Sequence, residues 1–284
     1  MDVAGIQREV AASLICLLAF AAPMASADDQ ALEIVRKSVL VDQANEERTK
    51  DYTFTEREEE RKPDAQGHMR SAGSKTWDTV ILYGRPFRRL IARNDKPLAD
   101  ADKKKEQERF DREVEKRKNE SPKDRQRAVA EQEKDRKEAR KFLDEVANVY
   151  NFRLLGEEPV SGHDTWVISA EPKPGYKPQN SDAANLLKMH GKLWIDKDGY
   201  HWVKVQAQVL NTISWGLFVV RMNPGSAFEF EQTRVNDEVW LPRHVLFHLN
   251  ARLVFKKYNA EIESTWSGFL KFATDSRIVS TGSN

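Results

Sequence analysis

The sequence His-Val-Leu-Phe-His-Leu-Asn-Ala-Arg-Leu-Val-Phe at residues 244–255 places an apolar side chain at every second position. In a β-strand, successive side chains point to opposite faces, so the apolar residues at 245, 247, 249, 251, 253 and 255 share one face. Polar residues such as His248 and Asn250 dominate the other face. The stretch therefore predicts a long strand with one apolar face.

The same alternation recurs on both sides of this strand, through residues 191–272. Val and Ala alternate with Lys and Gln at 203–209, and turn residues such as Asp198-Gly199 separate the alternating segments. No helical period fits. We predict consecutive antiparallel strands whose apolar face needs a cover. The segment 213–222 is apolar on both faces, which would suit a wall between a cavity and a covering helix.

Upstream of residue 191, further strands are predicted at 52–61, 76–83, 85–93, 151–157 and 163–171. An amphipathic helix is predicted from about Gln30 to Arg48, because Leu32, Val35 and Val39 have nearly helical spacing. A short helix is predicted from Ser181 to His190, with Gly191 ending it.

Charged residues of both signs fill most of residues 100–145, as in a solvated helix with many ion pairs. Ser121-Pro122 has the form of a helix start, so two helices are predicted here. The simpler interpretation is a helical arm that projects into solvent. An arm that binds a partner is the alternative.

Composition and the N-terminus indicate an exported protein. The chain has 284 residues, 39% hydrophobic, and a net charge of +1, which argues against a nucleic-acid partner. Residues 1–27 resemble a signal peptide with cleavage after Ala27, and their apolar run at 11–22 is short for a membrane anchor. Cys16, the one cysteine, follows Ile15 rather than a small residue, so lipidation there is not expected. We predict a periplasmic mature chain without disulfides.

No motif for catalysis, a cofactor or a metal is complete. Gly-Ser-Lys-Thr at 73–76 lacks the order of a phosphate loop, and Asp196–Gly199 is explained by a hairpin turn. His244 and His248 lie about 13 Å apart on one strand face, too far to share an ion. We therefore expect a protein that is not an enzyme and binds neither cofactor nor metal. No group of residues in the sequence supports the third alternative, a hydrolytic enzyme.

Four short motifs resemble the periplasmic lipoprotein-carrier family of LolA, LolB and RseB type. They are Gly-Lys-Leu-Trp-Ile-Asp at 191–196, Val-Lys-Val at 203–205, Phe-Glu-Phe at 228–230 and Trp-Leu-Pro at 240–242. The resemblance covers most of residues 30–275. It implies an α+β, mainly β fold, a curved, half-open antiparallel β-barrel whose mouth is covered by helices, around an apolar cavity for acyl chains. The charged helices are much longer than the lid of such a carrier.

The resemblance implies one domain at 28–275, with a helical insertion at about 100–147 and a polar tail at 276–284. The expected function is that of a soluble, monomeric carrier, which holds acyl chains of lipids or lipoproteins and meets inner- and outer-membrane sorting partners. An RseB-like sensor or scaffold that acts by protein contact is the alternative. A core filled by the helix at 31–48 would have the same composition as a cavity. The candidate cavity residues are Leu32, Val35, Val39, Ile213, Trp215, Leu217, Val219, Phe228, Phe230, Val245, Phe247, Leu249, Ile262 and Trp266.

Overall fold

The computed structural model describes residues 27–178, 183–215, 220–253 and 256–272. The predicted signal peptide, apart from Ala27, and the predicted polar tail lie outside the described residues. So do Leu217 and Val219.

Helices and strands follow one another in nearly the predicted order. The first half of the chain contains α1 (Ala27–Thr49), β1 (Tyr52–Pro63), β2 (Met69–Leu82), β3 (Arg85–Arg93), β4 (Lys96–Pro97), α2 (Asp100–Lys118) and α3 (Pro122–Val149). The second half contains β5 (Tyr150–Val160), β6 (His163–Pro172), α4 (Ala183–Leu186), β7 (Met189–Asp196), β8 (Trp202–Val209), β9 (Ile213–Trp215), β10 (Val220–Met222), β11 (Ala227–Val235), β12 (Val239–Leu253) and β13 (Lys256–Lys271).

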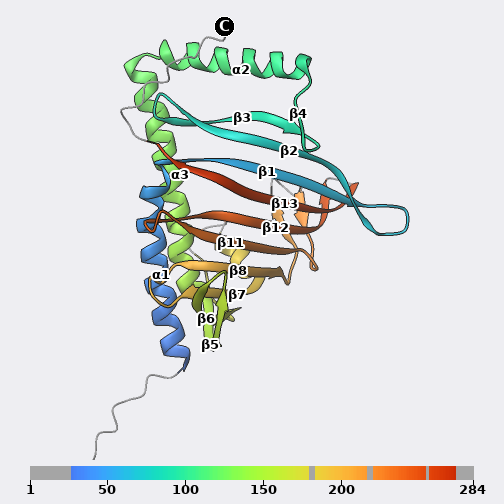
Figure 1. The fold of residues 1–284 in the computed structure, drawn as a ribbon. Coiled ribbons are helices and arrows are strands. Elements are labelled where there is room, and N and C mark those ends of the chain that lie inside the picture. The colour runs from blue at the N-terminus through green and yellow to red at the C-terminus, as the bar shows by residue number, and fades with distance from the viewer. Residues whose placement is uncertain (1–26, 179–182, 216–219, 254–255, 273–284) are drawn as a thin grey trace, which may run out of the picture.

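One 13-stranded sheet dominates the molecule (Figure 1). Its main path runs β4-β3-β2-β1-β13-β12-β11-β8-β7-β6-β5, and the short strands β9 and β10 branch from β12. Consecutive strands mostly pair as hairpins, whereas β1 pairs with β13 from the other end of the chain. The sheet stays open between β4 and β5. This confirms the predicted fold class, a curved, open antiparallel sheet with helices packed on it.

Helices α1 and α3 run side by side in opposite directions across the strands (Figure 1). Arg140 of α3 forms ion pairs with Glu46 at 3.1 Å and with Glu47 at 2.8 Å. The start of α3 is as predicted, since Ser121 caps it by accepting a hydrogen bond from the Asp124 amide at 3.1 Å.

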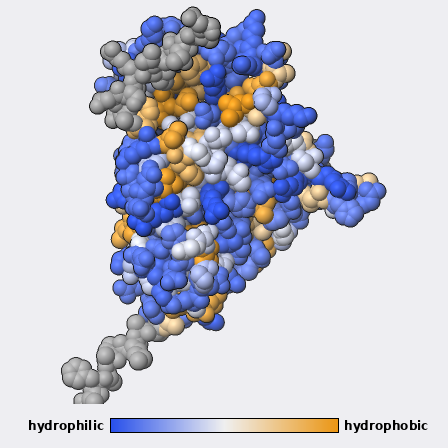
Figure 2. Space-filling view, viewed as in Figure 1, coloured by the Kyte–Doolittle hydropathy of each residue, from blue (hydrophilic) through white to orange (hydrophobic). Residues whose placement is uncertain are grey.

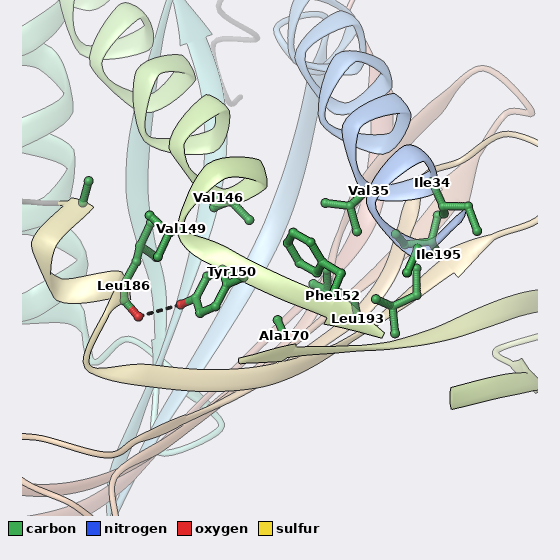
Figure 3. Packing of buried hydrophobic residues seen from close by; sticks show 13 residues of the cluster. Ile34, Val35, Val146, Val149, Tyr150, Phe152, Ala170, Leu186, Leu193 and Ile195 are labelled. Atoms are coloured by element: carbon green, nitrogen blue, oxygen red, sulfur yellow. Dashed lines mark hydrogen bonds between the residues drawn. The ribbon is translucent and has the colours of Figure 1, made fainter. Parts of the chain in front are cut away.

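The main hydrophobic core lies where the two helices meet the sheet (Figure 3). Val35 of α1 and Val149 of α3 are fully buried there against Phe152, Ile168 and Ile195 of the sheet. We call the sheet face toward this core the inner face. Because side chains alternate along a strand, the pairing register assigns every strand residue to the inner or the outer face.

The charged helices pack against the rest of the protein, whereas the sequence predicted an arm that projects into solvent. Phe110 of α2 makes an edge contact with Phe87 of β3, with the ring centroids 5.7 Å apart. Arg117 of α2 is buried and donates hydrogen bonds to the carbonyls of Leu82 and Arg85 at 2.9 and 2.7 Å. The view in Figure 2 is mostly hydrophilic, with hydrophobic side chains in separate patches. Phe110 and Arg117, which lie within the highly charged segment, therefore attach α2 to the sheet.

The predicted helix from Ser181 to His190 is wrong in its extent. Only α4, at Ala183–Leu186, is helical among the described residues of this segment, and Gly191 lies inside strand β7. The apolar residues of this segment are divided between the helix and the strand: Leu186 belongs to α4, and Met189 belongs to β7 and pairs with Val209 of β8.

Candidate functional site

A continuous row of cross-strand neighbours crosses the inner face. Pairing in register joins Ala170 to Gly191, Gly191 to Ala207, and Ala207 to Phe228. The row continues, one residue per strand, through Phe247, Ile262, Glu60 and Gly73. Neighbours in such a row lie on the same face of the sheet. We refer to these eight residues as the cross-strand row.

An apolar cavity of about 200 Å³ lies at one end of the row. Its floor consists of the small residues Ala170, Gly191 and Ala207, so three adjacent strands leave the space above them open. Any side chain at Gly191 would be blocked, because a Cβ there would lie 2.3 Å from the backbone oxygen of Gln206. The walls come from α3, α4 and the neighbouring strands: Phe142, Leu143, Val146, Tyr150, Leu186, Met189, Leu193, Trp202, Val205 and Phe228.

Tyr150 shows how this apolar site satisfies its polar atoms. Its hydroxyl donates to the backbone oxygen of Leu186 at 2.8 Å, as Figure 3 shows. Burial raises the pKa of Tyr150 above its usual range, so the hydroxyl stays neutral at physiological pH. Tyr150 therefore adds an uncharged side chain to this mostly apolar wall.

A polar cavity of about 430 Å³ lies at the other end of the row, where Gly73 leaves space on β2. Glu58, Glu60, Lys75 and Arg93 line it. The Tyr258 hydroxyl, also in the lining, donates a hydrogen bond to Glu60. That bond and partial burial raise the pKa of Tyr258 to about 12, and the same bond lowers the pKa of Glu60. Both signs of charge are thus present in one hollow.

A third, smaller hollow of about 180 Å³ surrounds Trp240 near the end of α1. The imidazoles of His163 and His201 lie on the Trp240 ring, at centroid distances of 4.6 and 5.2 Å. Asp196 is buried, and its carboxylate lies 3.5 Å from His163 Nδ1. Burial lowers the pKa of His201 to about 4. Asn45 of α1 bonds to the Trp240 backbone in both directions, so this cluster anchors the helix.

The other histidines on long strands have carboxylate partners on the outer face. His244 Nε2 lies 3.0 Å from Glu263, and His248 Nδ1 lies 3.1 Å from Glu261. Within the described part of the chain, no group of three or more His, Cys, Asp or Glu side chains could hold a metal ion.

The predicted cavity residues of the sheet lie together on the inner face, but they do not all line the same cavity. Phe228 lines the apolar cavity and lies 5.0 Å from Phe247, centroid to centroid. Val35, Val39 and Ile213 are buried. Val245 is buried as well, and the remaining described positions are half-buried: Leu32, Phe230, Leu249, Ile262 and Trp266. Trp215 belongs to β9, and its side chain lies outside the described part of the structure.

Sequence reasoning missed the small residues on which the apolar cavity depends. A glycine within a strand is a signal for a close approach of another backbone or a ligand, and Gly191 would have given that signal had it been assigned to a strand. Ala170 and Ala207 carry no such mark, because an alanine in a strand looks like ordinary core.

Comparison with known proteins adds a resemblance in fold. No protein-family model and no curated protein matches the chain. Among solved structures, a DUF1329 family protein from Desulfovibrio piger is 13% identical, with a TM-score of 0.30, over 87% of this chain and 95% of its own. A LolA superfamily protein from Nitrosomonas europaea is 10% identical, with a TM-score of 0.28, over 86% and 93%. The MucA/MucB complex from Pseudomonas aeruginosa matches at 11% identity, with a TM-score of 0.24, over 86% and 100%. One of these solved structures is described as a LolA superfamily protein, the type of protein that the sequence motifs resemble.

Proposed function

We propose that this protein binds the acyl chain of a lipid or lipoprotein in the apolar cavity and carries it through the periplasm without chemical change. The single observation behind the proposal is a cavity on the inner face whose floor is small and whose walls are apolar. The cavity gives a hydrocarbon chain an apolar environment, which water does not provide.

The energetics of burial suit this role. Each methylene removed from water contributes about 0.8 kcal/mol, so a chain can be held without a specific polar contact. Cavities of about 150 Å³ lined by apolar side chains already take up benzene. A cavity of about 200 Å³ accepts part of an acyl chain, and the half-buried rings of Phe228 and Phe247 extend the apolar path along the row.

A carrier also needs to travel between membranes, and several features suit that role. The charged helices α2 and α3 expose many ionised side chains, and the net charge is close to zero. No described helix has the length and apolar character needed to cross a bilayer. Under this proposal the protein is an exported monomer that exchanges its cargo with partners at the inner and outer membranes, and the chain from 28 to 275 acts as one domain.

The test fills the cavity from its floor. Ala207→Leu adds an apolar side chain where the floor is open, so it should weaken binding of a fluorescent alkyl probe about tenfold or more, while the folded protein keeps or gains stability. Gln208→Leu is the matched control, since Gln208 is the next residue on β8, exposed and on the outer face. Full probe binding by Ala207→Leu would refute the proposal.

A sensor or scaffold of RseB type is the second candidate, and one observation favours it. Large apolar side chains are exposed on the two long helices, Leu40 by 65% on α1 and Val129 by 55% on α3. Such residues are typical of a contact surface. Native mass spectrometry of protein purified from a periplasm separates the two functions, because a carrier retains an acyl species that Ala207→Leu lacks.

A further inference from the structure

The apolar and polar cavities lie at opposite ends of the same cross-strand row. From Ala207 the row crosses three strand spacings to Ile262, about 14 Å in all at about 4.8 Å each. Ile262 itself lines the polar cavity, and Phe228 lines the apolar one. Phe247, which lies between them, is half-buried. Apolar side chains therefore follow one another along the row from one cavity to the other.

Both cavities arise in the same way. Each lies over a glycine of the row, Gly191 at the apolar end and Gly73 at the polar end. Gly73 adopts a φ of 144°, and a Cβ there would lie 3.2 Å from the Asn94 side chain. A side chain on the inner face of β2 is thus strained at this position, and the hollow stays open.

The charges of the polar cavity lie in a second row beside the first. Glu58 pairs in register with Lys75, and Lys75 pairs with Arg93. The Glu58 side chain has neither a hydrogen bond nor an ion pair with any residue that the structure describes, although Tyr258 and Lys62 both contact the nearby Glu60 side chain. Arg93 approaches Asp102 only at 4.0 Å. The side chains of Glu58 and Lys75 therefore lack a hydrogen bond or ion pair with any described residue, and Arg93 has only this long ion pair, so all three can take a ligand.

We propose that the polar cavity holds the head group of the same ligand whose hydrocarbon chain occupies the apolar cavity, and that this head group carries one cationic and one anionic group. The proposal rests on the function proposed above and names its ligand class, a zwitterionic amphiphile. An ammonium group would face Glu58, and a phosphate or other anion would face Lys75 and Arg93. A purely anionic head group would meet the repulsion of two carboxylates, and a purely cationic one would meet two basic side chains.

Competition against the uncharged alkyl probe tests this head-group site. Phosphatidylethanolamine, phosphatidylglycerol and diacylglycerol with the same short acyl chains differ only in the head, which is zwitterionic, anionic or uncharged. Phosphatidylethanolamine should compete about tenfold better than the other two, the gain expected from one charge-assisted hydrogen bond. Glu58→Gln should remove its advantage over phosphatidylglycerol, and Lys75→Met should weaken both phospholipids relative to diacylglycerol.

Matched controls lie on the outer face of β13. Glu261→Gln and Lys257→Met remove the same charges there, and both should keep the preference of the unaltered protein. Equal competition by the three lipids, or better competition by phosphatidylglycerol, would overturn the head-group site while leaving the acyl-chain carrier intact. Failure of the alkyl probe itself to bind would refute the proposed function and this inference together.

Discussion

The His201 imidazole is a group whose pKa in the folded chain lies well below its ordinary value. Burial lowers the pKa of its imidazole from 6.5 to about 4, and Arg234 and Arg48 add to the effect, while Asp196 opposes it. Its Nδ1 atom is buried without a hydrogen-bond partner in the described part of the chain. The folded protein therefore favours the neutral ring.

The pH dependence of stability follows from that difference. Below pH 6.5 the unfolded chain binds a proton at His201 and the folded chain does not, so the free energy of unfolding falls as the pH drops from about 6.5 toward 4. The shift corresponds to at most about 3 kcal/mol, and solvent near the half-buried ring reduces it.

Replacing the ring tests this assignment. His201→Phe keeps a ring beside Trp240 and removes the titrating group, so its melting temperature should change less between pH 7 and pH 5 than that of the unaltered protein. His68→Gln, at an exposed position, is the control and should leave the pH profile as it is. Equal slopes for His201→Phe and the unaltered protein would show that other groups set the acid sensitivity.

At the residue scale, the sequence predicted which side chains face inward but not which of them leave space. The alternation around Phe228 and Phe230 placed Glu229 and Glu231 on the opposite face, and both form ion pairs there with Lys204, at 2.9 and 3.0 Å. A cavity depends on residues that are too small to fill their positions. Ala207 became recognisable as a floor residue only when the register placed it between Gly191 and Phe228.

At the scale of elements, α2 protects the free edge of the sheet. Strand β4 pairs only with Ala92 and Arg93, so most of the outer edge of β3 lacks a partner strand. Side chains of α2 take its place, since Glu106 accepts from the Leu90 amide at 2.9 Å and Arg109 donates to the Arg88 carbonyl. An uncovered edge is prone to pair with other chains. Some charged side chains of α2 therefore cover the edge of β3, while others face water.

Arg117 is the residue on which this cover depends most. Arg117→Met keeps much of the buried volume, but it leaves the Leu82 and Arg85 carbonyls without the guanidinium donor and removes the nearest basic partner of Glu113. The loss of a buried, charged hydrogen-bond donor should lower the free energy of unfolding by about 3 kcal/mol in urea titration. Light scattering should also show self-association, because the edge of β3 becomes accessible.

The neighbouring Arg112 provides the control for that experiment. It is exposed on α2, so Arg112→Met should change the free energy of unfolding by no more than about 0.5 kcal/mol. If both variants are equally stable, α2 is held by Phe110 and its ion pairs rather than by Arg117.

At the scale of the whole molecule, local pattern predicted the strands but could not predict all of their pairing. Hairpins such as β7–β8 follow from a turn at Asp198-Gly199, which the sequence marks clearly. The pairing of β1 with β13 joins Tyr52 to Lys271 across nearly the whole chain, and no local signal encodes it. That pairing brings Glu60 beside Ile262 and so completes the cross-strand row. The polar cavity could not be predicted for the same reason, since its residues come from both ends of the sequence.

Binding should stabilise the molecule as a whole if the apolar cavity is the ligand site. A ligand that binds only the folded state adds RT ln(1 + [L]/Kd), about 2.7 kcal/mol at a hundredfold excess over Kd. Protein stripped of lipid should therefore melt at a lower temperature than protein saturated with a zwitterionic lipid. Ala207→Leu fills the same space with its own side chain, so the stripped variant should melt at or above the temperature of the stripped parent and gain little from added lipid. A parent protein whose melting temperature does not respond to saturating lipid would contradict this, because a cavity that fills on binding must lower the free energy of the folded state.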